Sequence, residues 1–559
     1  MNFIRKFCKT EYAVLVGIVV LAAFLRFYKL ETVPSGFYVD EAAIGYNSYS
    51  ILETGADEYG KFFPIFLRSF GAYSSPLYTY LTTLPIFLFG LNILSVRLLS
   101  VLSGILNVIF FFLILKETGL IKRIRFILLG TFLFAIMPWN IFFSRGAFEA
   151  NLALMLFMFS IYLFLLSRKK FILMYIATAF LSLSTYAYQA QRLVAYIFLI
   201  GVLPIFFRGK LLKRQVVFSV LLFFIIQMPQ LLVLTSPAFT LRASGLFYKD
   251  AVISQADKIL LLPQPISYFL AFVREFLAQF VSYLSPKNLF FLPDSDFQRS
   301  IPELSVFYSW MIIPFLSGTF LIFAKREKKI FNFLILLIVA SIIPVSLTGD
   351  PFSSLRSLSL VLPYCLIIAK GMETLGEKGK STFWGLTLLI TFFSFIVFWR
   401  SYFVLFPKER AKTWDYGYTQ LAQIIKNNSE KKFVIDQSRM NPSYVLLAFF
   451  LKYPPEEFQK LTDPKIKDAY YSNIQFNPHY SFSNIETRQI FWEEDVYKEQ
   501  ILVGDELAVS EVQAKEHSLE KVFEIKGPLG DIIFVGYKSH PELKCINTDF
   551  RSPRCNEFI

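Results

Sequence analysis

Two adjacent acids, Asp40 and Glu41, stand in the segment YKLETVPSGFYVDEAAIGYNSYSILETG, shortly after the first long apolar run. An acid at membrane depth is costly and therefore suggests a function, such as taking a proton from a reacting hydroxyl or amine. A structural explanation is also available, because aspartate favours the N-cap of a helix and acids favour its first turn. The spacing alone leaves both explanations open.

Charged residues recur at the ends of the later apolar runs: Arg97, Arg145, Glu149, Arg192 and Arg356. Arg145 and Glu149 are four residues apart, so a helix would bring them to one side as a structural ion pair. Several arginines at one membrane surface instead suit a phosphate, which a guanidinium binds bidentately. A carboxylate beside such a cluster suits glycosyl transfer, in which a base deprotonates the acceptor and cations stabilise the leaving phosphate. An anion transporter would need the same residues.

The elements that must position these residues are membrane helices. The chain has 559 residues, 55% of them hydrophobic and only 18% charged, against roughly 25% charged in a soluble domain. Its mean hydropathy is +0.50. The net charge of +14 comes from short basic clusters between apolar runs, which fits membrane topology and anionic lipid better than nucleic acid. The chain is therefore a polytopic membrane protein.

Hydropathy predicts an all-α membrane domain over residues 1–403 with about eleven transmembrane helices. The predicted spans are 12–28, an uncleaved first helix, and 97–115, 126–143, 150–167, 171–188, 192–207, 216–235, 306–324, 330–348, 354–370 and 382–403. The segment 77–91 is short and contains a proline. Treating it as an interfacial or re-entrant helix places the basic segments IRKFCK, KETGLIKRIR, SRKK, RGKLLKR, KREKK and KGMETLGEKGK on one side. The positive-inside rule then predicts a cytoplasmic N-terminus and an extracytoplasmic C-terminal region.

Three segments face outward in this topology: 29–96, 236–305 and 404–559. The first two are expected to form the catalytic side. In the second, Asp294, Asp296 and Arg299 follow an aromatic run. A solvated bend is the simpler explanation of these three, although the aromatic residues could lie along a lipid or a sugar.

Residues 404–559 alternate helix-like and strand-like stretches, which predicts a small extracytoplasmic α/β domain with a hairpin over Phe523–Gly536. Acceptor binding or packing against the outer loops is its expected role. Cys545 and Cys555 flank a short polar loop there; in an oxidising compartment they could form a disulfide, or they could remain unpaired.

A metal site is not predicted, because His479, His517 and His540 lack the spacing of metal ligands. Carboxylates could still hold a divalent cation. No other cofactor is indicated.

Several segments together resemble bacterial members of the GT-C superfamily related to protein O-mannosyltransferases and lipid A aminoarabinose transferases: VDEAAIGYNSYSILETGADEYG, SPLYTYLTTLPIFLFGLNILSVRLLSVLSG, FFSRGAFEANLALML, YAYQAQR and SLRSLSLVLPYCLIIAKG. The resemblance covers most of residues 1–403. It implies a multi-pass protein of the plasma membrane with a GT-C-type fold. It also implies an inverting transfer of a hexose or pentose from a polyprenyl-phosphate donor to an extracytoplasmic protein, lipid or polysaccharide.

The resemblance assigns the catalytic carboxylate to Asp40, with Glu41 in support. Arg145, Arg192 and Arg356 are phosphate-binding candidates by position only. Relatives often have a histidine before the arginine in the turn where this chain has PFSSLR, so ligand contacts do not transfer to that turn.

A transporter or flippase for a lipid-linked sugar or another anion is the main alternative. Such a protein is expected to show internal repeats or broken helices in corresponding halves, and the sequence shows neither pattern. An inactive relative whose outer domain binds a partner is a third hypothesis. The sequence identifies neither the sugar nor the acceptor.

Overall fold

A computed structural model of the chain describes residues 10–207, 213–240, 248–259, 261–325, 328–350, 352–476, 479–546 and 553–557. The predicted basic clusters IRKFCK, RGKLLKR and KREKK lie wholly or partly outside these residues. The chain divides into two compact units. Unit 1 comprises Met1–Leu30, Tyr73–Tyr78 and Arg97–Phe403, and unit 2 comprises Glu31–Ala72, Thr79–Val96 and Val404–Ile559. The first outer loop therefore belongs largely to the same unit as the C-terminal region.

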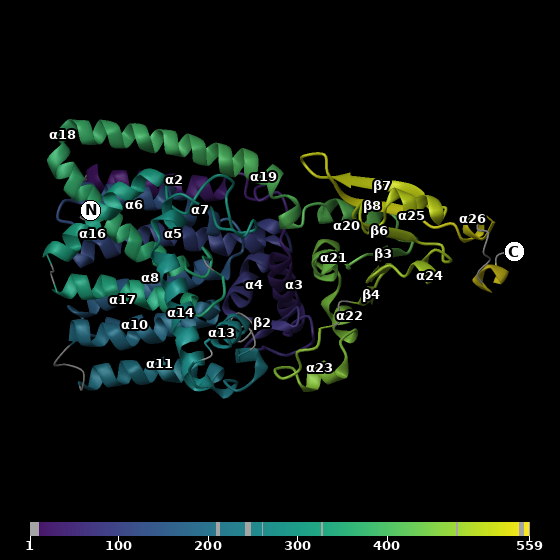
Figure 1. The fold of residues 1–559 in the computed structure, drawn as a ribbon, viewed down its shortest axis with the longest axis horizontal. Helices are drawn as coiled ribbons and strands as arrows, with labels where there is room; N and C mark the ends of the chain where they lie inside the picture. The colour runs from purple at the N-terminus through teal and green to yellow at the C-terminus, as the bar shows by residue number, and fades with distance from the viewer. Residues whose placement is uncertain are drawn as a thin grey trace. The chain divides into compact units, whose positions relative to one another are not determined.

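Unit 1 is helical (Figure 1). Its helices are α2 (Thr10–Phe27), α5 (Ile93–Thr118), α6 (Ile124–Ile136), α7 (Pro138–Phe143), α8 (Glu149–Ser167), α9 (Leu173–Ala187), α10 (Gln189–Phe207), α11 (Arg214–Leu232), α13 (Lys249–Ala256), α14 (Gln264–Leu284), α15 (Pro286–Phe290), η1 (Ser309–Met311), α16 (Ile312–Lys325), α17 (Lys328–Ser346), η2 (Leu358–Leu360), α18 (Val361–Trp399) and η3 (Arg400–Leu405).

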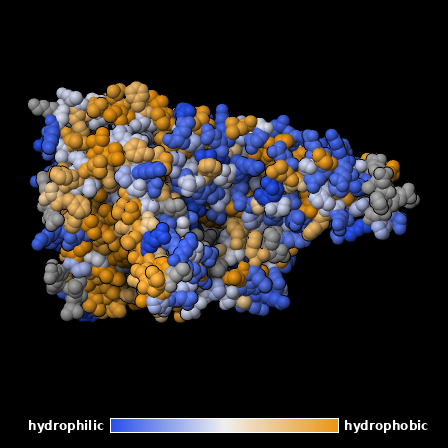
Figure 2. Space-filling view, viewed as in Figure 1, coloured by the Kyte–Doolittle hydropathy of each residue, from blue (hydrophilic) through white to orange (hydrophobic). Residues whose placement is uncertain are grey.

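Seven helices of the described residues are long and apolar enough to cross a membrane: Ile93–Thr118, Glu149–Ser167, Gln189–Phe207, Arg214–Leu232, Lys328–Ser346, Leu358–Gly379 and Ser381–Glu409. Their outward faces are apolar; Leu388, for example, is 74% exposed and Phe392 is 59% exposed. Figure 2 shows apolar side chains gathered over the helices of this unit. A surface of this kind is stable against lipid tails rather than water. The protein is therefore a multi-pass membrane protein, as the sequence predicts.

Three predicted spans differ from the helices observed. The span 126–143 is divided between α6 and α7, because Met137 is extended and Pro138 begins the second helix. A residue before proline disfavours the helical conformation, and proline suits a first helical position. The spans 354–370 and 382–403 both overlap a single helix, α18, which is bent beside its label in Figure 1. The exact number of spans stays a prediction.

The segment 77–91 forms α4 (Leu77–Phe89), a helix of 13 residues with Pro85 inside it. At this length it falls short of the ~20 residues that cross a bilayer. Its exposed side chains include Leu84, Phe87 and Leu88, all apolar. An interfacial or re-entrant position remains our prediction for it.

Unit 2 contains a six-stranded sheet in the order β4-β5-β3-β6-β8-β7. The strands are β3 (Phe433–Ile435), β4 (Tyr480–Phe482), β5 (Ile485–Thr487), β6 (Ile501–Gly504), β7 (Glu520–Lys526) and β8 (Ile532–Lys538). Strand β3 pairs in parallel with β5 and β6, while the remaining pairs are antiparallel. Val434, Leu502 and Val535 form the centre of its core. The predicted α/β region is thus confirmed, and the predicted hairpin lies in β7 and β8.

The other elements of unit 2 are short. They are α3 (Val39–Thr54), β1 (Leu67–Ser69), α19 (Phe406–Glu409), η4 (Lys412–Trp414), α20 (Tyr418–Asn427), α21 (Ser443–Leu451), α22 (Pro455–Lys460), α23 (Pro464–Asp468), α24 (Trp492–Asp495), α25 (Glu511–Glu516), α26 (Pro541–Ile546) and η5 (Pro553–Glu557). Strand β2 (Ala72–Ser74) lies mostly in unit 1. Helix α3 packs against α21 and α22. It carries the Asp40–Glu41 pair.

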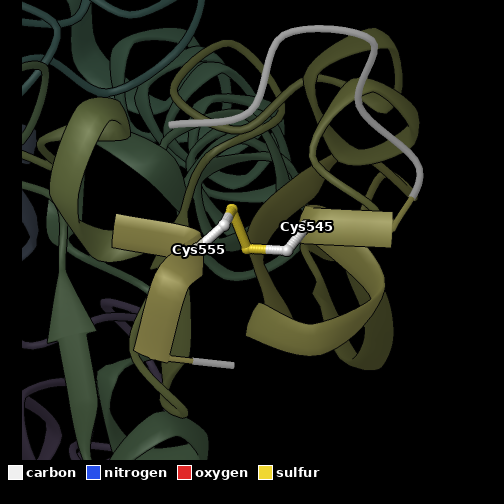
Figure 3. The surroundings of a disulfide bond; sticks show 2 residues. All are labelled: Cys545 and Cys555. Atoms are coloured by element: carbon white, nitrogen blue, oxygen red, sulfur yellow. A yellow bond between two sulfur atoms is a disulfide. The ribbon is translucent and has the colours of Figure 1, made fainter. Parts of the chain in front are cut away.

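A disulfide joins Cys545 of α26 to Cys555 of η5, with their Cα atoms 5.5 Å apart (Figure 3). Both residues are buried. Disulfides persist in oxidising compartments. The bond therefore agrees with an extracytoplasmic location of this region.

Replacing Cys545 with serine should lower the stability of unit 2 by about 2–3 kcal/mol, because a loop of roughly ten residues is no longer closed in the unfolded chain. With Cys8→Ser and Cys365→Ala as background, a membrane-impermeant maleimide should label the intact protein only after reduction. Labelling without a reductant would show that the two thiols are free and would contradict the bond.

Candidate functional site

Helix α3 begins in an unusual way, because acids from two parts of the chain supply its N-terminal acceptors. The first N–H groups of any helix lack partners within the helix. Here the Glu41 carboxylate accepts a hydrogen bond from the Tyr38 backbone N–H at 3.3 Å. The Asp415 carboxylate accepts one from the Val39 N–H at 2.9 Å, across 376 positions of sequence. Glu41 and Asp415 therefore cap the helix.

The two acids of the pair have different environments. Glu41 is 3% exposed, whereas the side chain of Asp40 is exposed. The structural explanation considered for the pair thus applies to Glu41. Asp40 stays at the surface of the first helical turn, where the helix dipole favours the ionised carboxylate. An ionised, accessible carboxylate is the form that a general base requires.

Close packing fixes the position of α3. A Cβ on Gly45 would lie 2.5 Å from the Phe449 ring and 2.8 Å from Val96, so the helix surface there approaches its neighbours without a side chain between them. The Tyr46 hydroxyl donates to the Tyr453 carbonyl at 3.0 Å. The Gln459 amide donates to Ser50, Thr54 and the Asp57 carbonyl at 2.9–3.0 Å. These contacts hold Asp40 on a rigid element.

A buried polar cluster follows α3 in the segment DEYG, which comprises residues 57–60. Glu58 is 1% exposed and accepts a hydrogen bond from the Asn47 amide at 3.3 Å. The Tyr470 hydroxyl donates to the Asp57 carboxylate, and the Arg68 guanidinium donates to the carbonyls of Asn473 and Gln475. The cluster therefore ties the first outer loop to the segment 470–476 within unit 2.

Burial raises the pKa of both acids in this cluster. It raises the pKa of Glu58 to about 8, against the opposing hydrogen bond from Asn47 and with a further increase from the charge of Asp57. It raises the pKa of Asp57 to about 6, against the hydrogen bond from Tyr470. Near neutral pH, the environment thus favours a protonated Glu58 beside a mostly ionised Asp57.

Arg97 and Arg145 lie at the end of α2 in unit 1. Both are fully buried. The Arg145 guanidinium donates to the carbonyls of Leu25, Arg26 and Tyr28 at 2.6–2.9 Å. Arg97 donates to the Leu30 carbonyl at 2.8 Å. Helix ends leave carbonyls without partners, and cations there also interact favourably with the helix dipole. Arg145 thus caps the end of α2, while Arg97 bonds the turn that follows the helix. These hydrogen bonds account for the burial of both arginines.

The other predicted residues of unit 1 lie in three different elements of the chain. Arg192 is 8% exposed near the start of α10, with its guanidinium 4.7 Å from the Phe239 ring centre. Arg356 forms an ion pair with Asp350. Glu149 is the first residue of α8 and is half-buried, a place where the helix dipole favours a carboxylate.

Asp294 of the second outer loop is buried rather than solvated. It is 5% exposed and accepts hydrogen bonds from the Ser354 N–H and hydroxyl at 2.7 and 2.6 Å. Gln191 similarly accepts a hydrogen bond from the Ser359 hydroxyl at 3.1 Å. The turn 353–359 is thereby joined both to the second outer loop and to α10. The simple explanation of Asp294 as part of a solvated bend is wrong, because Ser354 supplies partners that local sequence does not reveal.

Asp40 and Glu41 belong to unit 2, whereas Arg97, Arg145, Glu149, Arg192 and Arg356 belong to unit 1. The convergence of acids and arginines at one site therefore stays a prediction. Within the described ranges, no group of three histidine, cysteine or acidic side chains is placed to hold a metal ion.

Sequence reasoning missed Asp415, Glu58 and Arg68. Asp415 lies in the stretch TWDYGY, and Glu58 follows α3 directly in DEYG. An acid within an aromatic or apolar stretch is a weak signal of burial, since isolated charges are seldom fully buried. No local pattern names their distant partners.

Replacing Arg145 with lysine should destabilise the protein by about 2–4 kcal/mol, because a single ammonium cannot reach the three carbonyls that the guanidinium bonds. Chemical unfolding in detergent measures this change, with the exposed Arg168→Lys as the matched control. An unchanged stability combined with a raised KM for the donor would instead indicate that Arg145 binds phosphate.

The raised pKa of Glu58 predicts a pH-dependent stability. An acid whose pKa is raised on folding binds its proton more tightly in the folded state. Its contribution to the free energy of unfolding is therefore complete below the unfolded pKa of about 4.5 and is lost as the pH rises through the folded pKa of about 8. The apparent Tm should therefore fall between pH 5 and 8.5, and by less in Glu58→Gln. The exposed Glu53→Gln serves as the control. Equal falls in Glu58→Gln and the wild type would contradict the assignment.

Comparison with known proteins supports the fold. Neither a protein-family model nor a curated protein matches the chain. The oligosaccharyltransferase AglB from Archaeoglobus fulgidus, solved with an inhibitory peptide and a dolichol-phosphate, is 13% identical, with a TM-score of 0.50 over 96% of this chain and 75% of that chain. ArnT from Cupriavidus metallidurans in the apo state is 12% identical, with a TM-score of 0.43 over 96% and 99%.

At these identities the likeness to the oligosaccharyltransferase concerns the fold alone, and the likeness to ArnT is more distant. The arrangement of apolar helices followed by a C-terminal α/β region agrees with the resemblance seen in the sequence. The chain thus has a membrane fold similar to that of the oligosaccharyltransferase, in agreement with the GT-C-type fold that the resemblance implies.

Proposed function

We propose that the chain is an inverting membrane glycosyltransferase that moves a sugar from a polyprenyl-phosphate carrier to an extracytoplasmic acceptor. The observation that carries the proposal is the division of roles within the acid pair. Glu41 is buried and caps α3, whereas Asp40 is exposed one position earlier on the same rigid helix. Asp40 is the residue to which the resemblance assigns the base.

The proposed reaction uses Asp40 as the general base. The acceptor hydroxyl or amine attacks C1 of the sugar while Asp40 takes its proton. The bond between C1 and the phosphate oxygen breaks on the opposite face, and its electron pair leaves with the polyprenyl phosphate. One displacement at C1 inverts the anomeric configuration.

A lipid phosphate as leaving group is supported by the oligosaccharyltransferase of similar fold, which was solved with a dolichol-phosphate. In this chain Arg192 and Arg356 are the arginines that we propose as phosphate ligands, because Arg145 already bonds carbonyls at the end of α2 and Arg97 bonds the Leu30 carbonyl just beyond it. A guanidinium can exchange an exposed carboxylate such as Asp350 for a phosphate. A divalent cation also stays a prediction. Among the residues that the structure describes, no group of three histidine, cysteine or acidic side chains could hold one.

We also propose that the C-terminal region lies outside the cell and that the N-terminus is cytoplasmic. The positive-inside distribution supports this orientation. The Cys545–Cys555 disulfide supports it independently, because such bonds persist in oxidising compartments.

The Asp40→Asn variant tests the function. The change is nearly isosteric, so the variant should insert, fold and bind donor as the wild type does. Transfer should fall on the order of 10²- to 10⁴-fold, which is the usual contribution of a general base. Purified protein is given a panel of radiolabelled polyprenyl-phosphate sugars with membrane extract as the source of acceptors, and donor consumption is measured.

Glu53→Gln, an exposed acid at the other end of α3, is the matched control and should keep wild-type turnover. Glu41→Gln should lose stability more than turnover, since it weakens a cap. If neither the wild type nor Asp40→Asn consumes any donor while both bind it equally, the enzyme proposal fails. A transporter of the lipid-linked sugar would then be the better explanation, and movement of the donor across vesicles would test it.

A further inference from the structure

The turn 410–417 packs against the N-terminus of α3, although it lies far away in sequence. A Cβ on Gly36 would lie 1.7 Å from the Trp414 carbonyl oxygen. Only glycine therefore allows the two backbones to approach this closely. The Tyr38 and Trp414 rings also meet, with centres 6.2 Å apart. This contact lies entirely within unit 2.

Asp415 is the residue of this turn that reaches the helix. One carboxylate oxygen accepts the hydrogen bond from Val39 at 2.9 Å, and the other accepts a hydrogen bond from the Asn441 amide at 2.9 Å. The backbone of Asp415 is left-handed, with φ at 52°, a conformation that aspartate and asparagine tolerate better than most residues. Both the main chain and the side chain of Asp415 are thus held in place.

We propose that Asp415 is a positioning residue for Asp40: it fixes the first turn of α3 through Val39 and sets the negative charge beside the base. The inference rests on the proposed role of Asp40. Val39 directly precedes Asp40 in the chain, so the Asp415 hydrogen bond holds the residue from which the base projects.

Asp415 titrates near neutral pH. Burial raises its pKa to about 7; the hydrogen bonds from Asn441 and Val39 lower it, and the charges of Asp40 and Glu41 on α3 raise it. Asp415 is half-buried as a residue, and protein atoms surround its carboxyl group. The Asp415 carboxyl also interacts with Tyr418 on α20.

Ionisation of Asp415 changes the strength of the base. Above about pH 7 Asp415 is ionised, and its negative charge interacts with Asp40. A like charge makes a carboxylate bind its proton more tightly. A stronger base takes the acceptor proton more readily. The kcat of the wild type should therefore rise about two- to threefold between pH 6 and 8. The KM for the donor should not change, because in this proposal Asp415 acts through Val39 and Asp40.

The Asp415→Asn variant tests this inference. Asparagine keeps an oxygen to accept the Val39 hydrogen bond but carries no charge. The rise in kcat between pH 6 and 8 should disappear, with kcat staying at its low-pH value. The wild-type KM should be retained. A rise that persists in Asp415→Asn overturns the inference, and so does its absence from the wild type.

Asn441→Ala gives an independent test that leaves Asp415 and α3 in place. The Asn441 hydrogen bond lowers the pKa of Asp415, so its removal should move the step in kcat to higher pH. A uniform loss of kcat at every pH, with the step unmoved, would assign Asp415 a structural role only and overturn the inference.

Asp436→Asn is the matched control. Asp436 is a buried aspartate of the same unit, and it accepts hydrogen bonds from the backbone N–H groups of Ser438 and Ile490. The wild-type pH profile should survive this change. The base itself is tested separately, because Asp40→Asn lowers transfer on the order of 10²- to 10⁴-fold at every pH if the proposed function holds. If Asp40→Asn stays active, the proposed function fails, whatever the Asp415 variants show.

Discussion

The candidate site depends on one constraint: the backbone N–H groups at the start of α3 have no acceptor in the helical backbone and need one from elsewhere. A helix that begins beside packed neighbours needs acceptors for these groups. Glu41 supplies one acceptor from within the helix, and Asp415 supplies another from 376 positions further along the chain. Because these two acids meet the need, Asp40 remains exposed on a fixed turn. The site is thus a consequence of how the helix is capped.

The same physical need, at the opposite end of a helix, explains the buried arginines of unit 1. Arg145 bonds carbonyls at the end of α2, and Arg97 bonds the Leu30 carbonyl in the turn that follows, so two full charges are buried there. Burying a charge is tolerable only when it is well bonded. An arginine near the membrane surface is therefore not by itself a phosphate ligand. Arg192 lies over the Phe239 ring and Arg356 is paired with Asp350. We still propose these two arginines as phosphate ligands.

Local sequence predicts what local physics determines. Apolar runs of membrane length predicted the helices of unit 1. Alternating helix-like and strand-like stretches predicted the α/β region of unit 2, with the hairpin of β7 and β8. The break between α6 and α7 follows from Pro138, whose effect a hydropathy average hides. Asp40 and Glu41 were found by residue type, but their different roles depend on Asp415. The partners of Glu58, Asp57 and Arg68 are likewise remote, and no spacing within the first outer loop encodes them.

An experimental structure of the Asp40→Asn variant in lipid nanodiscs, determined with a bound polyprenyl-phosphate sugar, tests the central claim most directly. The account predicts that C1 of the sugar lies within about 5 Å of the side chain at position 40, with room for an acceptor oxygen between them. The phosphate should lie on the opposite side of C1 from that side chain. A donor whose C1 lies far from the N-terminus of α3 would contradict the account.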